Sequence, residues 1–213
     1  MQLYTFFRSS TSFRLRIALA YKGISYEAHY TSLPKMEHRA PDYLRLNPQG
    51  LVPALVDDAG KVFTQSMAMI EYLDDTHPKP SLMPKGAADK WYVRAVSQII
   101  GCEIHPLNNI RVLKYLKALG LDDGKINGDW YSHWIVEGMS ALEAFLVAEK
   151  RHGRFCFGDQ FSMADVCLVP QIYNAQRFKC DLAPYPTAMR IFAECDRLEC
   201  VRTTEPATQA DKF

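Results

Sequence analysis

The sequence carries almost no net charge, with 25 Lys and Arg residues against 24 Asp and Glu in a chain of 213. It has no basic run of the kind that follows a phosphate backbone, so we expect no nucleic-acid partner. It also lacks an apolar run as long as a membrane span, and the N-terminus lacks the charged-then-apolar pattern of a signal sequence. These absences predict a cytoplasmic protein without a membrane partner.

Cysteine is sparse and unevenly placed. All six cysteines lie at or beyond residue 102, and no two of them form a CxxC pair. They are too few for a disulfide scaffold and lack the spacing of zinc ligands. We therefore expect reduced thiols and no metal site.

The most informative stretch present is a run of four hydroxyl side chains, Ser9 to Ser12. A β-prone run, residues 2–7, precedes it, and an amphipathic helical pattern from Phe13 to Ile24 follows. The first backbone N–H groups of a helix lack internal partners and carry partial positive charge, which suits an anion. Spacing alone leaves two interpretations open, an anion site or an ordinary helix cap.

The first third of the chain alternates strand and helix patterns. Further strands are expected at residues 25–30, 51–56 and 61–64, with Pro53 at the start of its strand because proline cannot donate to a ladder. A turn at residues 57–60 predicts an antiparallel hairpin, and Gln65-Ser66 opens a helix. Together these patterns predict a small α/β domain of thioredoxin type.

Three prolines within residues 77–84 predict a linker. Beyond it the strand signals fade and helical faces follow one another, including a capping pattern formed by Ser162 and Asp165. The expected organisation is a thioredoxin-like domain over residues 1–78, a linker over 79–86, and an all-helical domain over 87–213.

Three motifs in this sequence resemble those of the zeta-class glutathione transferases. Residues 8–19 read RSSTSFRLRIAL, residues 47–55 read NPQGLVPAL, and residues 104–109 read IHPLNN. The resemblance covers nearly the whole chain and favours the anion-site interpretation of the hydroxyl run. Thr11 stands where the eukaryotic signature has Cys, which puts in doubt only a role that needs a protein thiol there.

The resemblance implies a glutathione transferase fold, a homodimer and reduced glutathione as cofactor. The family includes maleylacetoacetate isomerase and maleylpyruvate isomerase, which convert a cis-enedione dicarboxylic acid to its trans isomer. In that reaction a glutathione thiolate adds to the double bond, the resulting single bond rotates, and elimination restores the alkene. Because a free thiol has a pKa of about 8.5, the protein must favour the thiolate.

The family positions imply a set of site residues. The catalytic candidates are Ser9, Ser10 and Thr11, of which Ser10 and Thr11 face and bind the thiolate and Ser9 lies close by. Ser12 is the alternative helix cap. The further glutathione-binding candidates are His38, Val52, Gln65, Ser66, His105 and Asn109. Without the family, Ser66 reads as a plain helix cap.

A doubly charged acid needs cations, and the planar fork of arginine suits carboxylates. The resemblance implies Arg8, Arg111 and Arg177 as substrate-binding residues, whereas each could also be a solvated surface arginine. Arg14 and Arg16 are expected to be structural.

Several functions stay open. We expect maleylacetoacetate as substrate, with maleylpyruvate as the alternative that these arginines do not separate. A second class is transfer of glutathione to small α-haloacids. A third is a non-enzymatic binding or scaffolding protein, which should lack the hydroxyl run and the arginines.

Overall fold

A four-stranded sheet in the order β2-β1-β3-β4 forms the centre of the N-terminal part of the chain. Strand β1 (Gln2–Thr5) pairs in parallel with β2 (Glu27–Tyr30) and antiparallel with β3 (Ala54–Val56), which in turn pairs antiparallel with β4 (Val62–Phe63). The predicted parallel pair and antiparallel hairpin are both confirmed. Pro53 directly precedes β3, and the Val52–Pro53 peptide bond is cis.

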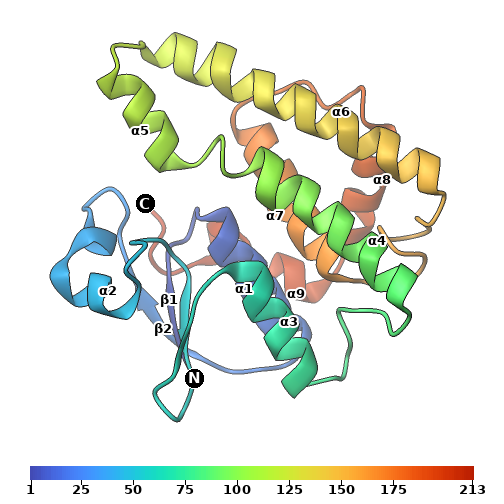
Figure 1. The fold of residues 1–213 in the computed structure, drawn as a ribbon, viewed down its shortest axis with the longest axis horizontal. Coiled ribbons are helices and arrows are strands. Elements are labelled where there is room, and N and C mark those ends of the chain that lie inside the picture. Colours follow the sequence, from blue (N-terminus) through green and yellow to red (C-terminus); the bar gives the residue numbers. More distant parts are fainter. The chain divides into compact units, whose positions relative to one another are not determined.

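Two helices, α1 (Ser10–Tyr21) and α3 (Ser66–Thr76), pack against each other beside this sheet (Figure 1). Helix α1 is buried along most of its length, and Gly23 follows it in a left-handed conformation with a φ of 66°. The long polar connection between β2 and β3 contains two elements that the sequence patterns did not predict, η1 (Glu37–Arg39) and α2 (Pro41–Leu46). Pro41 opens α2 at a position where its missing N–H costs nothing.

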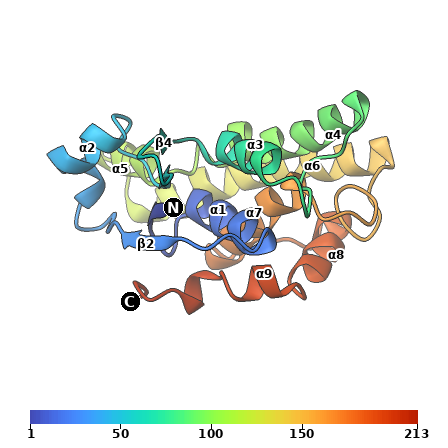
Figure 2. The same cartoon turned by 90° about the horizontal axis from the view of Figure 1, so that it is seen from below.

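The computed structural model describes residues 1–213 as two compact units. The first unit contains residues 1–83 and also residues 197–213, and the second contains residues 84–196. The C-terminal part of the first unit includes α9 (Glu199–Arg202) and η4 (Pro206–Thr208), and Figure 2 shows it running along α1 and β2. The sequence patterns had grouped these residues with the helical domain.

The buried guanidinium of Arg16 joins the two pieces of the first unit. Its Nε donates to the carbonyl of Thr204 at 3.1 Å, and its Nη2 donates to the carbonyl of Phe7 at 3.0 Å. Because a buried charged group is tolerated only when its donors are paired, this network accounts for Arg16 as a structural residue, as expected.

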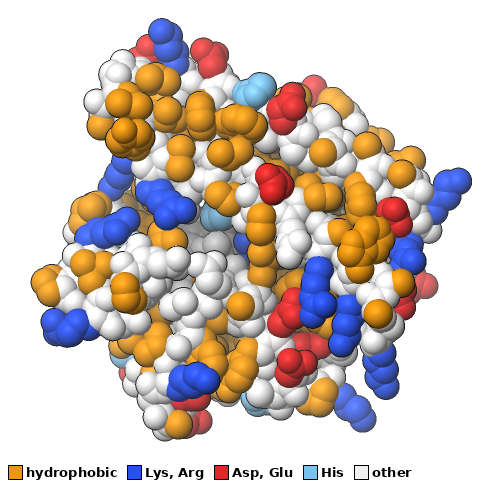
Figure 3. Space-filling view, in the orientation of Figure 1, with side chains coloured by type: hydrophobic (Ala, Val, Ile, Leu, Met, Phe, Trp, Pro, Cys, Tyr) orange, Lys and Arg blue, Asp and Glu red, His pale blue; other side chains and the backbone are white.

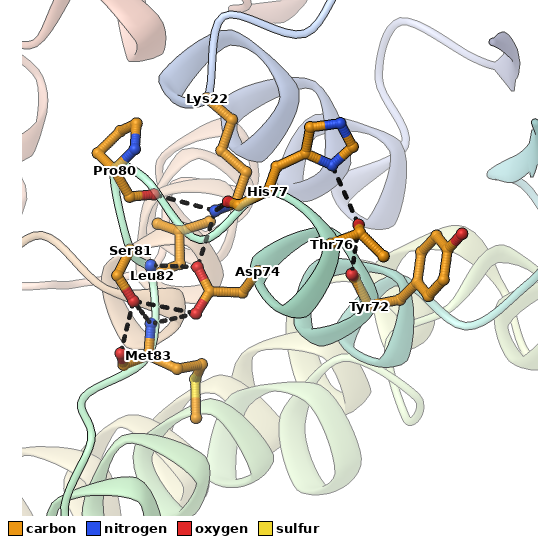
Figure 4. A network of polar contacts seen from close by, with 9 residues as sticks. All are labelled: Lys22, Tyr72, Asp74, Thr76, His77, Pro80, Ser81, Leu82 and Met83. Atoms are coloured by element: carbon orange, nitrogen blue, oxygen red, sulfur yellow. Dashed lines mark hydrogen bonds and ion pairs between the residues drawn. The ribbon is translucent and has the colours of Figure 1, made fainter.

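A buried ion pair fixes the chain where it leaves α3 (Figure 4). The ammonium group of Lys22 lies 2.8 Å from Asp74 and also donates to the carbonyls of His77 and Pro80 at 2.7 and 2.9 Å. The Asp74 carboxylate accepts from the backbone N–H groups of Leu82 and Met83 at 2.6 and 3.2 Å. The beginning of the expected linker is therefore part of the first unit.

The second unit is built from helices. They are α4 (Ala87–Gln98), η2 (Ile99–Ile104), α5 (Ile110–Ala118), η3 (Lys125–Trp130), α6 (Tyr131–Glu149), α7 (Met163–Arg177) and α8 (Pro186–Cys195). Segments η2 and η3 are π-helical, which the periodicity did not predict. None of the helices is both long and apolar enough to pass through a bilayer.

The predicted capping arrangement at the start of α7 is confirmed. The buried carboxylate of Asp165 accepts from the Ser162 backbone N–H at 2.8 Å and from the Cys156 backbone N–H at 2.7 Å. Burial raises the pKa of this carboxyl, while the hydrogen bonds from Cys156 and Ser162 oppose the rise. All six cysteines are free thiols, as expected.

Candidate active site

The hydroxyl run lies at the start of α1, where each side chain takes a different role. Ser9 is the N-cap, because its Oγ accepts from the Ser12 backbone N–H at 3.2 Å. Ser12 is fully buried and its Oγ accepts from the Phe6 backbone N–H at 3.4 Å. The alternative that Ser12 caps the helix is therefore wrong.

The hydroxyl of Thr11 points toward the loop that precedes β3. Its Oγ1 donates to the carbonyl oxygen of Val52 at 2.8 Å, and it lies 2.9 Å from the Ser9 Oγ. A carbonyl can only accept, so the single Thr11 proton goes to Val52 and Ser9 is the donor in the second bond. A directed chain of hydroxyls therefore runs from Ser9 through Thr11 to Val52.

Ser10 differs from Thr11 in exposure. Ser10 is the first residue of α1 and is only 6% exposed, whereas Thr11 is partly exposed. Of the two side chains that the resemblance assigns to the thiolate, Thr11 is thus the more accessible.

The loop that carries Val52 is held in place by its own side chains. The Asn47 amide donates to the Leu51 carbonyl at 2.7 Å, and the Tyr43 hydroxyl donates to the same oxygen at 2.6 Å. Gly50 has a φ of 58°, and a Cβ there would lie 2.8 Å from the Arg39 Nη1 and 3.0 Å from the His38 carbonyl oxygen. Only glycine fits this close approach, which brings buried His38 beside the loop.

The start of α3 reaches the same loop. The exposed Gln65 is the N-cap residue, has a φ of 69° and donates from its amide to the Gln49 Oε1 at 2.8 Å. A positive φ is rare for a residue with a side chain and is often found at binding sites. Ser66 is the first helical residue and is buried, so the alternative that Ser66 caps α3 is wrong.

Arg8 lies directly before the hydroxyl run, Ser9 to Ser12. Its guanidinium carbon is 4.9 Å from the centre of the Phe7 ring and 5.0 Å from that of Phe213. The first unit therefore gathers all its candidates, from Arg8 to Ser66, around the start of α1 and the Val52 loop. Gln49 was missed as a side chain although it lies in the motif at residues 47–55, and Phe213 carries no local signal.

In the second unit, the candidate Arg177 lies beside a stack of two aromatic rings. Tyr131 stacks on Phe178 with ring centres 3.7 Å apart, and the Arg177 guanidinium lies 4.5 Å from the Phe178 ring centre. Burial raises the pKa of the Tyr131 phenol well above its ordinary value, and the nearby charge of Arg177 opposes the rise. Tyr131 had been overlooked as part of this group.

The motif at residues 104–109 is hydrogen-bonded to the backbone of Tyr131. The Asn108 amide donates to the Tyr131 carbonyl at 3.1 Å, and Asn109 caps α5 by accepting from the Arg111 backbone N–H at 3.1 Å. His105 follows the π-helical segment η2 and is half-buried, whereas the Arg111 and Arg177 side chains are exposed. The second unit thus links His105, Asn109, Arg111 and Arg177 through one stretch of chain and one aromatic stack.

The chain is similar to known glutathione transferases. A family model for the N-terminal domain of glutathione S-transferases matches residues 8–76. The chain is 47% identical to the maleylpyruvate isomerase of a Ralstonia species over 212 residues, covering 99% of each chain.

Two solved structures superpose on the whole chain. One is a holo structure of maleylpyruvate isomerase, described as a bacterial zeta-class glutathione transferase, with a TM-score of 0.96, 46% identity and complete coverage of both chains. The other is the maleylacetoacetate isomerase of Methylobacterium extorquens AM1 with bound malonate and glutathione, with a TM-score of 0.96, 36% identity and complete coverage of both. With two units in this order and the hydroxyl run at the start of α1, the chain belongs to the zeta-class glutathione transferase family of maleylacetoacetate and maleylpyruvate isomerases.

Proposed function

We propose that the protein is a glutathione-dependent cis–trans isomerase that converts maleylacetoacetate to fumarylacetoacetate. The observation that carries the proposal is the Thr11 hydroxyl at the start of α1, bonded to the Val52 carbonyl at 2.8 Å. This pairing joins a hydroxyl suited to a thiolate with a main-chain group suited to a peptide. When bound, glutathione would supply the thiolate that adds to the double bond. The resulting single bond can then rotate, and elimination restores the alkene and the thiolate.

The donors of the first unit fit this tripeptide. The main chain of Val52, in the loop before β3, is suited to pair with the cysteinyl backbone. Gln65 and Ser66 lie at the start of α3, whose N–H groups and helix dipole suit the γ-glutamyl carboxylate. His38 lies beside the same loop and is assigned, like His105 and Asn109, to the glycyl end or to the cavity wall.

We assign the thiolate-facing hydroxyl to Thr11. Ser10 is almost fully buried, and the Ser9 hydroxyl is used as the cap of α1. When a cysteinyl N–H occupies the Val52 carbonyl, the Thr11 proton can turn to a thiolate, and the Ser9 hydroxyl still donates to the Thr11 oxygen. Ser9 thereby fixes the orientation of Thr11, and Ser10 contributes to the start of the helix.

These groups are strong enough for the task. Lowering a thiol pKa by about two units requires about 2.7 kcal/mol of preference for the anion. One hydrogen bond to a charged group contributes about 1.5–3 kcal/mol and a helix N-terminus about 0.3–1. Thr11 and the dipole of α1 together reach this sum without a protein thiol.

The two carboxylates of the substrate require cations. Arg8 directly precedes Ser9, the N-cap of α1. It is therefore close in sequence to Thr11, which we propose faces the thiolate. Arg111 and Arg177 are exposed guanidinium groups in the second unit. We propose that these three arginines bind the carboxylates, because guanidinium groups pair with them in a two-pronged geometry.

Maleylpyruvate is the second candidate substrate. The 47% identity to the Ralstonia maleylpyruvate isomerase supports it, and both acids carry the same cis-enedione and two carboxylates. The test is a comparison of kcat/KM for the two acids with the purified protein and glutathione, followed by ultraviolet absorbance. Turnover of neither acid would overturn the isomerase proposal, and turnover of an α-haloacid alone would favour the transferase alternative.

We also propose that the protein is a cytoplasmic homodimer. Large apolar side chains are exposed on the second unit, including Trp91 at 52% and Tyr115 at 65%, and Figure 3 shows hydrophobic side chains gathered over α5. Such exposure is typical of surfaces that bind another protein. Light scattering coupled to gel filtration tests the dimer, since a single-chain mass at micromolar concentration would contradict it.

A further inference from the structure

The segment that follows η4 folds back onto the end of β1. The Phe213 ring lies 5.1 Å from the Phe7 ring in an edge-on arrangement and 6.4 Å from the Phe6 ring, measured between centres. Phe6 and Phe7 are buried, whereas Phe213 is 77% exposed. Phe213 thus covers an aromatic cluster without being part of the core.

Asp211 anchors this segment at the residue before Arg8. Its Oδ2 accepts from the Phe7 backbone N–H at 2.9 Å, although 204 residues separate the two in sequence. Its Oδ1 is buried and has no hydrogen-bond partner. A buried acceptor without a partner costs free energy, so the Asp211 anchor holds this segment in place at a cost.

The same segment places Phe213 at Arg8. The Arg8 guanidinium carbon lies beside both aromatic rings, 4.9 Å from the centre of Phe7 and 5.0 Å from the centre of Phe213. We infer that Phe213 is a positioning residue for substrate binding, which holds the Arg8 guanidinium against its ring so that the donors of Arg8 face a substrate carboxylate. The inference rests on the proposed role of Arg8.

The physical basis is a cation–π contact. An exposed contact of this kind changes a binding constant about two- to fivefold, and it restricts a long side chain that would otherwise lose rotamer freedom on binding. The effect should fall on the doubly charged ligand alone, because the ring of Phe213 contacts Phe6, Phe7 and Arg8, none of which is assigned to glutathione.

The test measures malonate binding to the glutathione-loaded protein by calorimetry, together with KM and kcat. We expect Phe213→Ala and Phe213→Leu to weaken malonate binding and raise the substrate KM by about two- to fivefold, with kcat and glutathione affinity unchanged. Phe213→Tyr keeps the aromatic face and should restore wild-type values. The control is Tyr30→Ala, which removes another exposed ring, 46% exposed, from the same unit and should change nothing.

Variants of Arg8 separate this inference from the proposed function. With Arg8→Ala as background, adding Phe213→Ala should have no further effect on malonate affinity. The inference alone is overturned if Arg8→Ala weakens malonate binding but Phe213→Ala does not, if Phe213→Leu behaves as wild type, or if Phe213→Ala acts equally in both backgrounds. If Arg8→Ala leaves malonate affinity unchanged, the proposed role of Arg8 is wrong and the inference falls with it.

Discussion

The Thr11 hydroxyl and the Val52 carbonyl are hydrogen-bonded at 2.8 Å, although 41 residues separate them in the sequence. Their contact joins the start of α1 to the loop before β3. It also means that one proton serves two potential acceptors, the Val52 oxygen and a thiolate. The proposed function therefore assigns the central role in thiolate binding to the Thr11 side chain.

Replacing Thr11 by Val keeps the shape and removes the hydroxyl. The loss of a hydrogen bond to a charged sulfur should raise the pKa of the bound glutathione thiol by about one to two units. A higher pKa leaves less thiolate at neutral pH, so the acid limb of the kcat/KM profile should move to higher pH. Ultraviolet titration of the thiolate measures the shift, and Thr11→Ser is the control that should keep the wild-type pKa. An unchanged pKa in Thr11→Val would assign the thiolate to another hydroxyl.

Ser9 should behave differently, since its Oγ caps α1. Ser9→Ala is expected to lower the free energy of unfolding by about 1 kcal/mol, and Ser9→Gly by only a few tenths, as measured in urea. A thiol pKa shift in Ser9→Ala as large as that in Thr11→Val, with stability unchanged, would contradict its role as a cap.

The buried pair of Lys22 and Asp74 gives a third prediction. Lys22→Met leaves the Asp74 carboxylate buried without its cation, so the free energy of unfolding should fall by about 3–5 kcal/mol. The double variant Lys22→Met/Asp74→Leu should recover part of this loss because no charge is then stranded. The control is Lys117→Met, which breaks the exposed pair with Asp123 and should leave stability unchanged. Equal effects of the two Lys variants would show that the buried network does not stabilise the first unit.

The cysteines should alkylate in a defined order. Cys102 is exposed, whereas burial raises the pKa of the Cys200 thiol to about 11. At pH 8 only about one Cys200 side chain in a thousand is then a thiolate, which is the reactive form. Iodoacetamide followed by peptide mass spectrometry should find Cys102 modified first, with labelling of Cys200 rising as the pH approaches 11. Rapid labelling of Cys200 at pH 8 in the Cys102→Ser variant would contradict this order.

Much of the first unit follows from local signals in the sequence. The strand alternation, the turn at residues 57–60 and Pro53 predicted the sheet and its mixed pairing, because each depends on neighbouring residues. Helix α2 was missed because the connection around it is polar and Pro41 alone marks its start. The π-helical segments escaped for a related reason, since periodicity does not distinguish one wide turn from a regular helix.

The candidate site was likewise predicted only in part. The motif resemblance brought the hydroxyl run, Val52 and Gln65 into one hypothesis, and the first unit does bring them together. The roles of the four hydroxyls depend on which one accepts a hydrogen bond from the Ser12 backbone N–H, and tertiary geometry decides this. The contacts of Phe7 with Asp211 and of Arg8 with Phe213 join opposite ends of the chain, where no local pattern records them.

The return of residues 197–213 to the first unit has a consequence for how the protein is made and cut. During synthesis the ribosome releases residues 1–83 long before the segment that supplies the Thr204 carbonyl to Arg16 and the Asp211 carboxylate to Phe7. The N-terminal portion must wait for the last residues before its packing is finished. For the same reason a single protease cleavage near residue 84 cannot liberate an intact first unit, and an isolated version would need both pieces of its chain supplied together.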